Sequence, residues 1–416
     1  MLKSYNIQAE RVSGLMEWMK ESRAIYDKAL YILRQAYFSS KDQGKISTPT
    51  YNQLYTLMKD EQVYKASEMD APVKAHIVRQ ASDSWLSFMK ASASYRKCPD
   101  KFQGRPKMPG YLSRRGIDFN ILTISRNRIR KKTIDYRNHT IGLPKLKGYT
   151  LRLPKQLDID TIRQITVQMF FGKIKFNVIY EEKETKIEDL NCSSAIGIDI
   201  GLNNLCAITS NDKPLSYVVK GGPVKSLNQF YNKTLGRLKS DLERFNRGQK
   251  ISKRIQNLNL KRRNKIEDYL HKASKRIIDL CVEQRIGRIV IGHNKGWKQE
   301  IELGKRTNQN FVSIPFNRLI YMIRYKGLEK RIEVETVEES YTSKVDHMGL
   351  EPLCKQEVYS GQRVKRGLFL SGTGKILNAD INGAVGILRK ANAILDEELL
   401  LLQDRGDVVS PEVLKV

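Results

Sequence analysis

The chain has 416 residues, of which 40% are hydrophobic, enough for two or three domains with ordinary apolar cores. Its 74 lysine and arginine residues outnumber its 45 acidic residues and give a formal net charge of +29. This excess predicts a polyanionic partner, and nucleic acid is favoured over a basic membrane-surface role. No apolar stretch approaches the length of a spanning helix, so we expect no membrane partner.

The cysteines are widely scattered and contain no C-x-x-C pair. This spacing argues against a disulfide framework and against a tetrahedral zinc site, so no zinc is expected. The N-terminal sequence MLKSYNIQAERVSGL lacks the apolar core of a signal peptide, which predicts an intracellular protein. The five cysteines are Cys98, Cys192, Cys206, Cys281 and Cys354.

Residues 2–89 carry apolar side chains at helical spacing, interrupted by a polar segment at 39–50. Residues 90–115 then mix basic and aromatic side chains, with Arg105 and Lys107 between Phe102 and Tyr111. Such a mixture can contact phosphates and stack on bases. The alternative is a solvated linker.

From 119 to 182 the apolar period changes to two, and a turn at 171–173 predicts a hairpin. We expect a small antiparallel barrel or sheet, followed by a charged linker at 181–189. Its polar face carries Arg128 and Arg130 among other basic residues and indicates a second nucleic-acid surface. The alternative is that these charges protect exposed strands from aggregation.

Strand and helix signals alternate from Ser194 onward. We expect strands at 194–200, 205–209 and 216–219, a helical region at 224–285, a strand at 287–294, a helix at 316–325, a strand at 332–337 and a helix at 380–395. This order is that of the RNase H-like fold. The helical region carries candidate phosphate-binding residues, with a solvated face as the alternative. These candidates are Lys253, Arg254, Arg262 and Arg263.

Two acids stand in unusual surroundings. Asp199 lies among the isoleucines of the first strand, and Asp380 opens the last helix in a segment of small residues. A buried carboxylate requires a partner, which suggests a metal ion or a fixed hydrogen-bond network. The alternative for Asp199 is a strand-closing bond to turn amides. Two acids on separate elements suit a pair of Mg²⁺ ions about 3.5–4 Å apart in a phosphoryl-transfer site.

Several motifs occur in an order that resembles the TnpB family of insertion-sequence-encoded RNA-guided DNA nucleases. They are GIDIGLNNLCAIT, IVIGHNKGWKQE, NQNFVSIPFNRLIYMIRYKG, EESYTSK, SGQRVKRGLF and NADINGAVGILRK. The similarity is dense from about 194 to 390 and faint before that. It implies a RuvC nuclease domain related to type V CRISPR effectors, preceded by a helical recognition region and a β-barrel wedge domain.

By this resemblance Asp199 and Asp380 match the first and last RuvC aspartates. The position of the middle glutamate is Gly292 in this chain, a departure from the family pattern. Glu338 and Glu339 end the following strand, and we expect one of them, preferably Glu339, to have taken the catalytic role. The alternative is that both simply cap the loop.

The four-cysteine zinc finger of many family members is also missing. The segment SGQRVKRG stands in its place, and its Arg363 and Arg366 either contact the scissile phosphate or solvate a loop. His293 is a possible ligand or proton shuttle, although a hydrogen-bonded structural histidine is the simpler interpretation.

The resulting domain prediction has four parts. They are a helical recognition lobe with a basic linker at 1–115, possibly including a short N-terminal wedge strand, a wedge domain at 116–185, a RuvC-like domain at 186–392 with a helical insertion at 224–285, and a tail at 393–416.

Three functions remain open. The leading one is an RNA-guided DNA endonuclease that uses two Mg²⁺ ions, with Mn²⁺ as a substitute, and acts on double-stranded DNA in a prokaryotic cytoplasm near the nucleoid. The others are a guided binder that no longer cuts and a guide-free transposase or nuclease. The sequence gives no indication of the oligomeric state.

Overall fold

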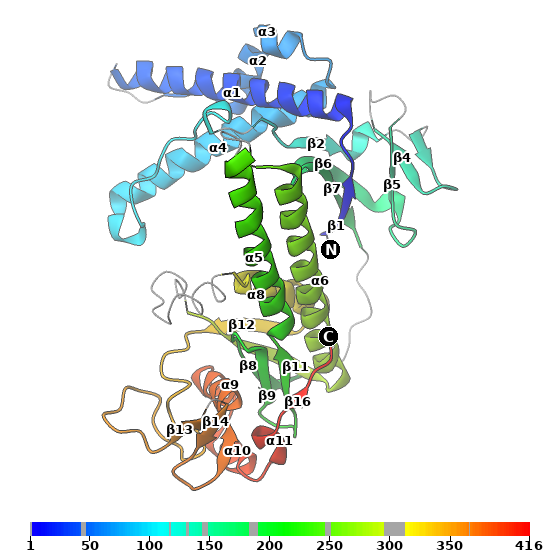
Figure 1. The fold of residues 1–416 in the computed structure, drawn as a ribbon. Helices are drawn as coiled ribbons and strands as arrows, with labels where there is room; N and C mark the ends of the chain where they lie inside the picture. Colours follow the sequence, from blue (N-terminus) through cyan, green and yellow to red (C-terminus); the bar gives the residue numbers. More distant parts are fainter. Residues whose placement is uncertain are drawn as a thin grey trace. The chain divides into compact units, whose positions relative to one another are not determined.

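The chain divides into two compact units, Met1–Lys183 and Glu184–Val416. The computed structural model describes residues 2–42, 47–115, 118–129, 133–143, 149–182, 190–245, 251–294, 313–365 and 367–416. Figure 1 shows the elements coloured along the sequence. The division falls close to the expected start of the RuvC-like domain at 186, and most of the expected linker at 181–189 lies outside the described ranges.

Four helices build the first half of unit 1. Apolar residues at helical spacing form the contact between the two longest, with Leu30 and Leu33 on one and Ile77 and Trp85 on the other all buried. This confirms the helical pattern predicted from the sequence. The helices are α1 (Ser13–Asp42), α2 (Tyr51–Asp60), α3 (Gln62–Lys65) and α4 (Ala71–Lys97).

The first residues of the chain form a strand, so the helical prediction was wrong for 2–9. Strand β1 (Leu2–Ala9) pairs antiparallel with β7 (Lys173–Glu181), with Leu2 opposite Glu181 and Ala9 opposite Ile174. The partner strand is more than 160 residues away, which explains why local periodicity failed here. The pairing agrees with the short N-terminal strand that the domain prediction allowed.

The strands of unit 1 form two antiparallel sheets. Its four-stranded sheet has the order β1-β7-β6-β2, and the predicted hairpin joins β6 to β7 through Phe171 and Gly172, both at positive φ. No pairing between β1 and β2 closes this sheet among the residues described, so the barrel stays a prediction. The strands are β2 (Leu122–Ser125), β6 (Ile162–Phe170), and, in a separate sheet, β3 (Ile134–Asp135), β4 (Thr140–Gly142) and β5 (Thr150–Arg152).

Unit 2 is built on a six-stranded sheet with the order β12-β11-β8-β9-β10-β16. The strands β8, β9 and β10 form an antiparallel meander, whereas β11 and β12 run parallel to β8. Five of these strands, β8 to β12, were predicted from the sequence, and β16 was not. The strands are β8 (Asn191–Asp199), β9 (Asn204–Ser210), β10 (Ser216–Lys220), β11 (Ile286–Gly292), β12 (Glu333–Val337) and β16 (Glu412–Val413).

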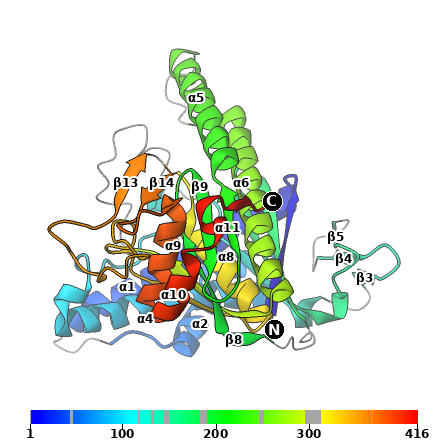
Figure 2. The same ribbon diagram turned by 90° about the horizontal axis from the view of Figure 1, so that it is seen from below.

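Helices cover both faces of this sheet. One apolar cluster joins Ile196 and Ile198 of β8 to α6 (Lys253–Glu283) and α8 (Phe316–Glu329), and the opposite cluster joins Ala195 to α9 (Ala379–Lys390). Successive residues of β8 therefore face different layers. Helix α5 (Gly222–Phe245) pairs with α6 as a long hairpin (Figure 2), which matches the expected helical insertion.

The C-terminal residues belong to the core of unit 2, so the predicted tail at 393–416 was wrong. Leu399, Leu402 and Leu414 are buried, and β16 adds the sixth strand beside β10. The elements of this region are α10 (Asp396–Leu402) and α11 (Gly406–Val409), and before α9 lies a small sheet of β13 (Gln362–Lys365), β14 (Leu368–Leu370) and β15 (Ile376–Asn378). No described helix is long and apolar enough to cross a membrane.

Candidate active site

Asp199 is the last residue of β8, and its side chain lies on the sheet face covered by α9. Its neighbours Ile198 and Ile200 belong to the core on the opposite face. A Cβ atom built at Gly383, in α9, would lie 2.8 Å from Oδ2 of Asp199. The absence of a side chain at 383 is therefore what allows α9 to pack directly against this carboxylate.

Asp380 lies in the first turn of α9, held by two asparagines. Oδ1 of Asn378, the helix N-cap, accepts hydrogen bonds from the backbone N–H of Asp380 at 3.0 Å and of Ile381 at 3.3 Å. Asn204, at the start of β9, donates from Nδ2 to Oδ2 of Asp380 at 2.8 Å. Asn204 thus fixes the direction of the Asp380 carboxylate, and Asn378 caps the helix that carries it.

Glu339 occupies the space that a side chain at Gly292 would need. Gly292 ends β11 opposite Val337 of β12, one residue beyond the Ile291–Ile198 pair that links β11 to β8. A Cβ atom at 292 would lie 2.7 Å from Oε1 and 2.8 Å from Cγ of Glu339. A carboxylate from the neighbouring strand end therefore reaches the position from which a residue at 292 would approach Asp199.

The backbone around Glu339 is fixed by hydrogen bonds. Its N–H donates to Oδ1 of Asn294 at 2.7 Å, and its carbonyl accepts from Oγ1 of Thr342 at 2.9 Å. Oε1 of Glu339, in contrast, is buried without a hydrogen-bond partner. A buried carboxylate oxygen without a partner is costly, and it indicates a site that a cation or a proton completes.

Glu338 has a different environment from Glu339. Its side chain is exposed, and its Oε1 accepts a hydrogen bond from Oγ of Ser340 at 2.6 Å. Glu339, and not Glu338, therefore lies close enough to Asp199 for the two carboxyl groups to interact electrostatically.

Burial and a neighbouring charge raise the pKa values of two of these acids, Asp199 and Glu339. Burial and the charge of Asp380 raise the pKa of Asp199 to about 7, while Arg363 acts in the opposite direction. Burial and the charge of Asp199 raise the pKa of Glu339 to about 8, opposed by Lys390. Within the described ranges, no three His, Cys, Asp or Glu side chains already converge as a ligand set for one ion.

These raised pKa values make stability depend on pH. At pH values below the pKa that Glu339 has in the unfolded chain, its carboxyl group is protonated in both the folded and the unfolded state. Its contribution to the free energy of unfolding is then fully present. That stability is lost as the pH rises toward about 8, because the folded site must then hold an uncompensated charge. In EDTA, Glu339→Gln should therefore be more stable than the wild type at pH 8.5, by on the order of 2 kcal/mol.

Thermal unfolding in EDTA at pH 5 and pH 8.5 measures this difference. The matched control is Glu338→Gln, which removes an exposed carboxylate and should leave the pH dependence unchanged. Equal curves for the wild type and Glu339→Gln at both pH values would show that Glu339 is not an electrostatically strained acid.

Family comparisons place these acids in matched segments. A family model described as "Probable transposase" (OrfB_IS605) matches residues 175–298, which include Asp199 and Gly292, and the "Cas12f1-like, TNB domain" model matches 316–387, which include Glu339 and Asp380. The TnpB-like protein ORF457 of Acidianus two-tailed virus is 21% identical over 408 residues, covering 91% of this chain and 83% of that protein. These matches support the assignment of the chain to the TnpB family.

The fold of this family member also resembles a solved structure, the cryo-EM structure of the Cas12f1-sgRNA-target DNA complex. The TM-score is 0.53 with 14% sequence identity, and the similarity covers 90% of this chain and 81% of that chain. At this identity the similarity concerns the fold.

Arg363 lies beside Asp380. It comes from β13, and its Nη2 is 3.4 Å from Oδ1 of Asp380 while the side chain remains about half exposed. Arg363, from the SGQRVKRG segment, is thus adjacent to Asp380. Arg366 lies outside the described residues. His293 is hydrogen-bonded through Nε2 to Oδ1 of Asn317 at 2.8 Å, which favours a structural role.

The basic candidates of unit 1 differ in their surroundings. Arg105 and Lys107 are exposed. Arg128 forms a bidentate contact with the buried Asp70, whose Oδ2 accepts from Nε at 3.1 Å and from Nη2 at 2.7 Å, so its guanidinium has a structural partner. This ion pair disfavours the predicted phosphate contact at Arg128. Arg130 lies outside the described ranges.

The basic residues of α6 also divide into two groups. Lys253 and Arg254 are exposed at its start. Arg262 is held inside unit 2, because it donates from Nε to Oδ1 of Asn228 at 2.8 Å and from Nη2 to the Ser313 carbonyl at 3.0 Å. We therefore assign Arg262 a structural role, contrary to the nucleic-acid contact expected from the sequence.

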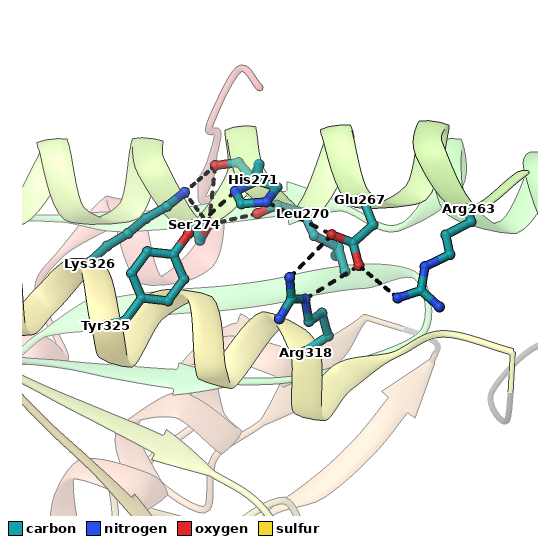
Figure 3. Close-up of polar contacts among 8 residues, drawn as sticks. All are labelled: Arg263, Glu267, Leu270, His271, Ser274, Arg318, Tyr325 and Lys326. Atoms are coloured by element: carbon teal, nitrogen blue, oxygen red, sulfur yellow. Dashed lines mark hydrogen bonds and ion pairs between the residues drawn. The ribbon is translucent and has the colours of Figure 1, made fainter. Parts of the chain in front are cut away.

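Arg263 lies at one end of a row of polar contacts between α6 and α8 (Figure 3). Glu267 of α6 is 3.7 Å from Arg263 and 3.3 Å from Arg318 of α8. Further along, Nζ of Lys326 donates to the His271 carbonyl at 2.6 Å and to Oγ of Ser274 at 2.7 Å. Arg263 is about half exposed and only its outer part is available to a phosphate.

Sequence reasoning missed three residues that position Asp380 and the turn of Glu339. Asn204 orients Asp380, Asn294 fixes the backbone of Glu339, and Lys390 donates from Nζ to the Ser340 carbonyl at 2.9 Å. Asn204 begins β9 and Asn294 follows β11 by two residues, both within quoted motifs, so polar residues next to strand termini were the available signal. The sequence around Lys390 gave no such signal, because its hydrogen-bond partner lies in a loop 50 residues away.

Proposed function

We propose that this TnpB family member is an RNA-guided DNA endonuclease of transposon origin, with Asp199, Glu339 and Asp380 as its catalytic acids. The observation that carries the proposal is the placement of Glu339 in the space left by Gly292, beside Asp199. A chain that had lost cleavage would have no need to bring a third, buried acid to this position. The family membership supports the same reaction class.

The side chains present fit hard divalent cations. Carboxylate oxygens are the ligands that Mg²⁺ prefers, and Oε1 of Glu339 is buried without a hydrogen-bond partner. Asp199, Glu339 and Asp380 would hold two Mg²⁺ ions, with Mn²⁺ as a substitute. Bound there, the ions would supply an activated water and stabilise the leaving oxygen.

The protein's own residues prepare the site for this chemistry. Asn204 directs the Asp380 carboxylate and Asn378 caps the helix that carries it, while the hydrogen bonds of Asn294 and Thr342 hold the turn that carries Glu339. Arg363 lies 3.4 Å from Asp380 and is about half exposed, so it is a cation beside the proposed catalytic acids that a phosphate can reach. We propose Arg363 as a phosphate contact on this ground.

Guide RNA and double-stranded DNA are the proposed partners. The net charge of +29 and the exposed Arg105, Lys107, Lys253 and Arg254 support polyanion binding. The solved Cas12f1 structure that shares the fold contains guide RNA and target DNA. A prokaryotic cytoplasm, near the nucleoid, is the corresponding location.

Gly292→Ala tests the placement of Glu339. A methyl group at 292 would meet Glu339 Oε1 at 2.7 Å and Ile387 Cδ1 at 2.5 Å, both closer than real contacts allow. The Glu339 side chain must move, so we expect cleavage to fall by about tenfold or more while RNA binding is unchanged. Ala at the exposed Gly222, where nothing lies within 4 Å of the added Cβ, is the matched control. Wild-type cleavage by Gly292→Ala would contradict the placement.

Sequencing the RNA that co-purifies with the protein tests guided recognition. We expect one discrete species with a defined 3′ sequence. Heterogeneous fragments would indicate binding by charge alone and would contradict the guided function.

A further inference from the structure

A pocket of about 640 Å³ lies in unit 1 between the C-terminal parts of α1 and α4 and the loop that follows α4. This volume is within the range of small-molecule sites, roughly 300–1,000 Å³. Its aromatic lining residues are Tyr37 and Phe38 of α1 and Phe88 and Tyr95 of α4.

The rings of this lining are held by other rings. Tyr37 packs edge-on against Trp85 with ring centroids 5.6 Å apart and against Phe88 at 6.5 Å. Tyr95 packs edge-on against Phe102 at 5.7 Å. These contacts fix the ring positions, so little side-chain freedom is lost when a flat ligand stacks there.

The loop that supplies Arg105, Pro106 and Met108 to the pocket is tied to α1 just beyond these residues. Arg34 of α1 donates from Nη1 to the Pro109 carbonyl at 3.0 Å. The carboxylate of Asp27, also in α1, accepts from the N–H of Leu112 at 2.7 Å and of Ser113 at 3.1 Å. The pocket is therefore preformed without a ligand.

Three cations line the same pocket, Lys41, Arg96 and Arg105, and no acidic residue lines it. All three are exposed, and none forms an ion pair within the described part of the chain. Arg128 and Arg262, in contrast, are held by partners inside the protein. Aromatic rings with unpaired cations at the rim match a base flanked by phosphates.

We propose that this pocket binds one unstacked base of a single-stranded nucleic acid, with Lys41, Arg96 and Arg105 contacting the adjoining phosphates. This inference rests on the proposed function only in requiring that the chain binds nucleic acid. It narrows the stacking expected of residues 90–115 to one pocket, and it adds Tyr37, Phe38 and Lys41 of α1 to the residues involved.

Binding of fluorescein-labelled oligouridylate and oligothymidylate to the full chain, freed of co-purified RNA, tests the proposal. Tyr95→Ala should weaken binding by about tenfold, the typical effect of losing one stacked base, and Tyr95→Phe should restore it. Arg105→Ala should weaken binding and lower its salt dependence.

The matched control is Tyr31→Ala, which removes an exposed tyrosine of α1 that does not line the pocket. Comparison of the two oligonucleotides distinguishes RNA from DNA as the source of the base.

Photo-crosslinking of the wild-type chain to 4-thiouridine RNA locates the base without any substitution. We expect crosslinks in the peptides that contain Tyr37 or Tyr95. Crosslinks confined to other segments, equal affinities for Tyr95→Ala and Tyr31→Ala, or equally strong competition by polyglutamate would overturn the proposal. Guided cleavage by a Tyr95→Ala variant with unchanged oligonucleotide binding would remove this site alone and leave the proposed nuclease intact.

Discussion

Glu339→Gln is expected to reduce guided DNA cleavage by about two orders of magnitude or more. The substitution keeps the size of the side chain but removes the charge that would hold a cation. Changes in the outer shell of metal sites alone cost about 10–100-fold, so loss of a direct ligand should exceed that. Cleavage of a guide-matched plasmid in Mg²⁺ measures the effect, with RNA binding recorded in parallel.

Glu338→Gln is the internal control for this experiment. Glu338 is exposed and bonded to Ser340, so its substitution should leave cleavage near the wild-type rate. If Glu338→Gln abolished cleavage and Glu339→Gln did not, the roles assigned to the two glutamates would be reversed. If both variants cut normally, no third acid acts from this turn.

Asp199→Ala should abolish cleavage while RNA binding remains intact. Asp199 lies against Gly383 and is electrostatically coupled to both other acids, so its removal leaves the proposed site without its central carboxylate. The expected loss is about a thousandfold or more, to the background of the assay.

The control for Asp199→Ala is Asp199→Asn, which preserves shape and should fold at least as well as the wild type in EDTA. Its cleavage should be equally low. Loss of RNA binding in both variants would instead indicate that Asp199 is structural, the alternative left open by its position at a strand end.

The sequence predicted those parts of the fold that depend on local pattern. The period-two residues around Phe171 and Gly172 specified the β6–β7 hairpin, and the alternation of strands and helices from 194 specified the order of unit 2. Such local patterns could not decide whether Glu338 or Glu339 points toward Asp199. Strand alternation ends at Val337, and the direction of the following side chains is decided by Asn294 and Thr342 from outside the strand.

Long-range partners explain the predictions that failed. Leu2–Ala9 form a strand because β7 offers an edge, and 393–416 join the core because β10 and α9 are there to cover them. Arg262 was expected to contact nucleic acid because it is basic, but its guanidinium donates hydrogen bonds to Asn228 and Ser313 inside unit 2. A single sequence shows the charge of a residue and not the group that neutralises it.

Cleavage of double-stranded DNA by the purified protein and its co-purified RNA tests the central claim most directly. One plasmid carries a site complementary to the guide portion of that RNA, and the other carries the same site scrambled. We predict Mg²⁺-dependent cutting of the first plasmid only. Stable binding of the first plasmid without cutting, in Mg²⁺ or Mn²⁺, or equal cutting of both plasmids would contradict guided cleavage by Asp199, Glu339 and Asp380.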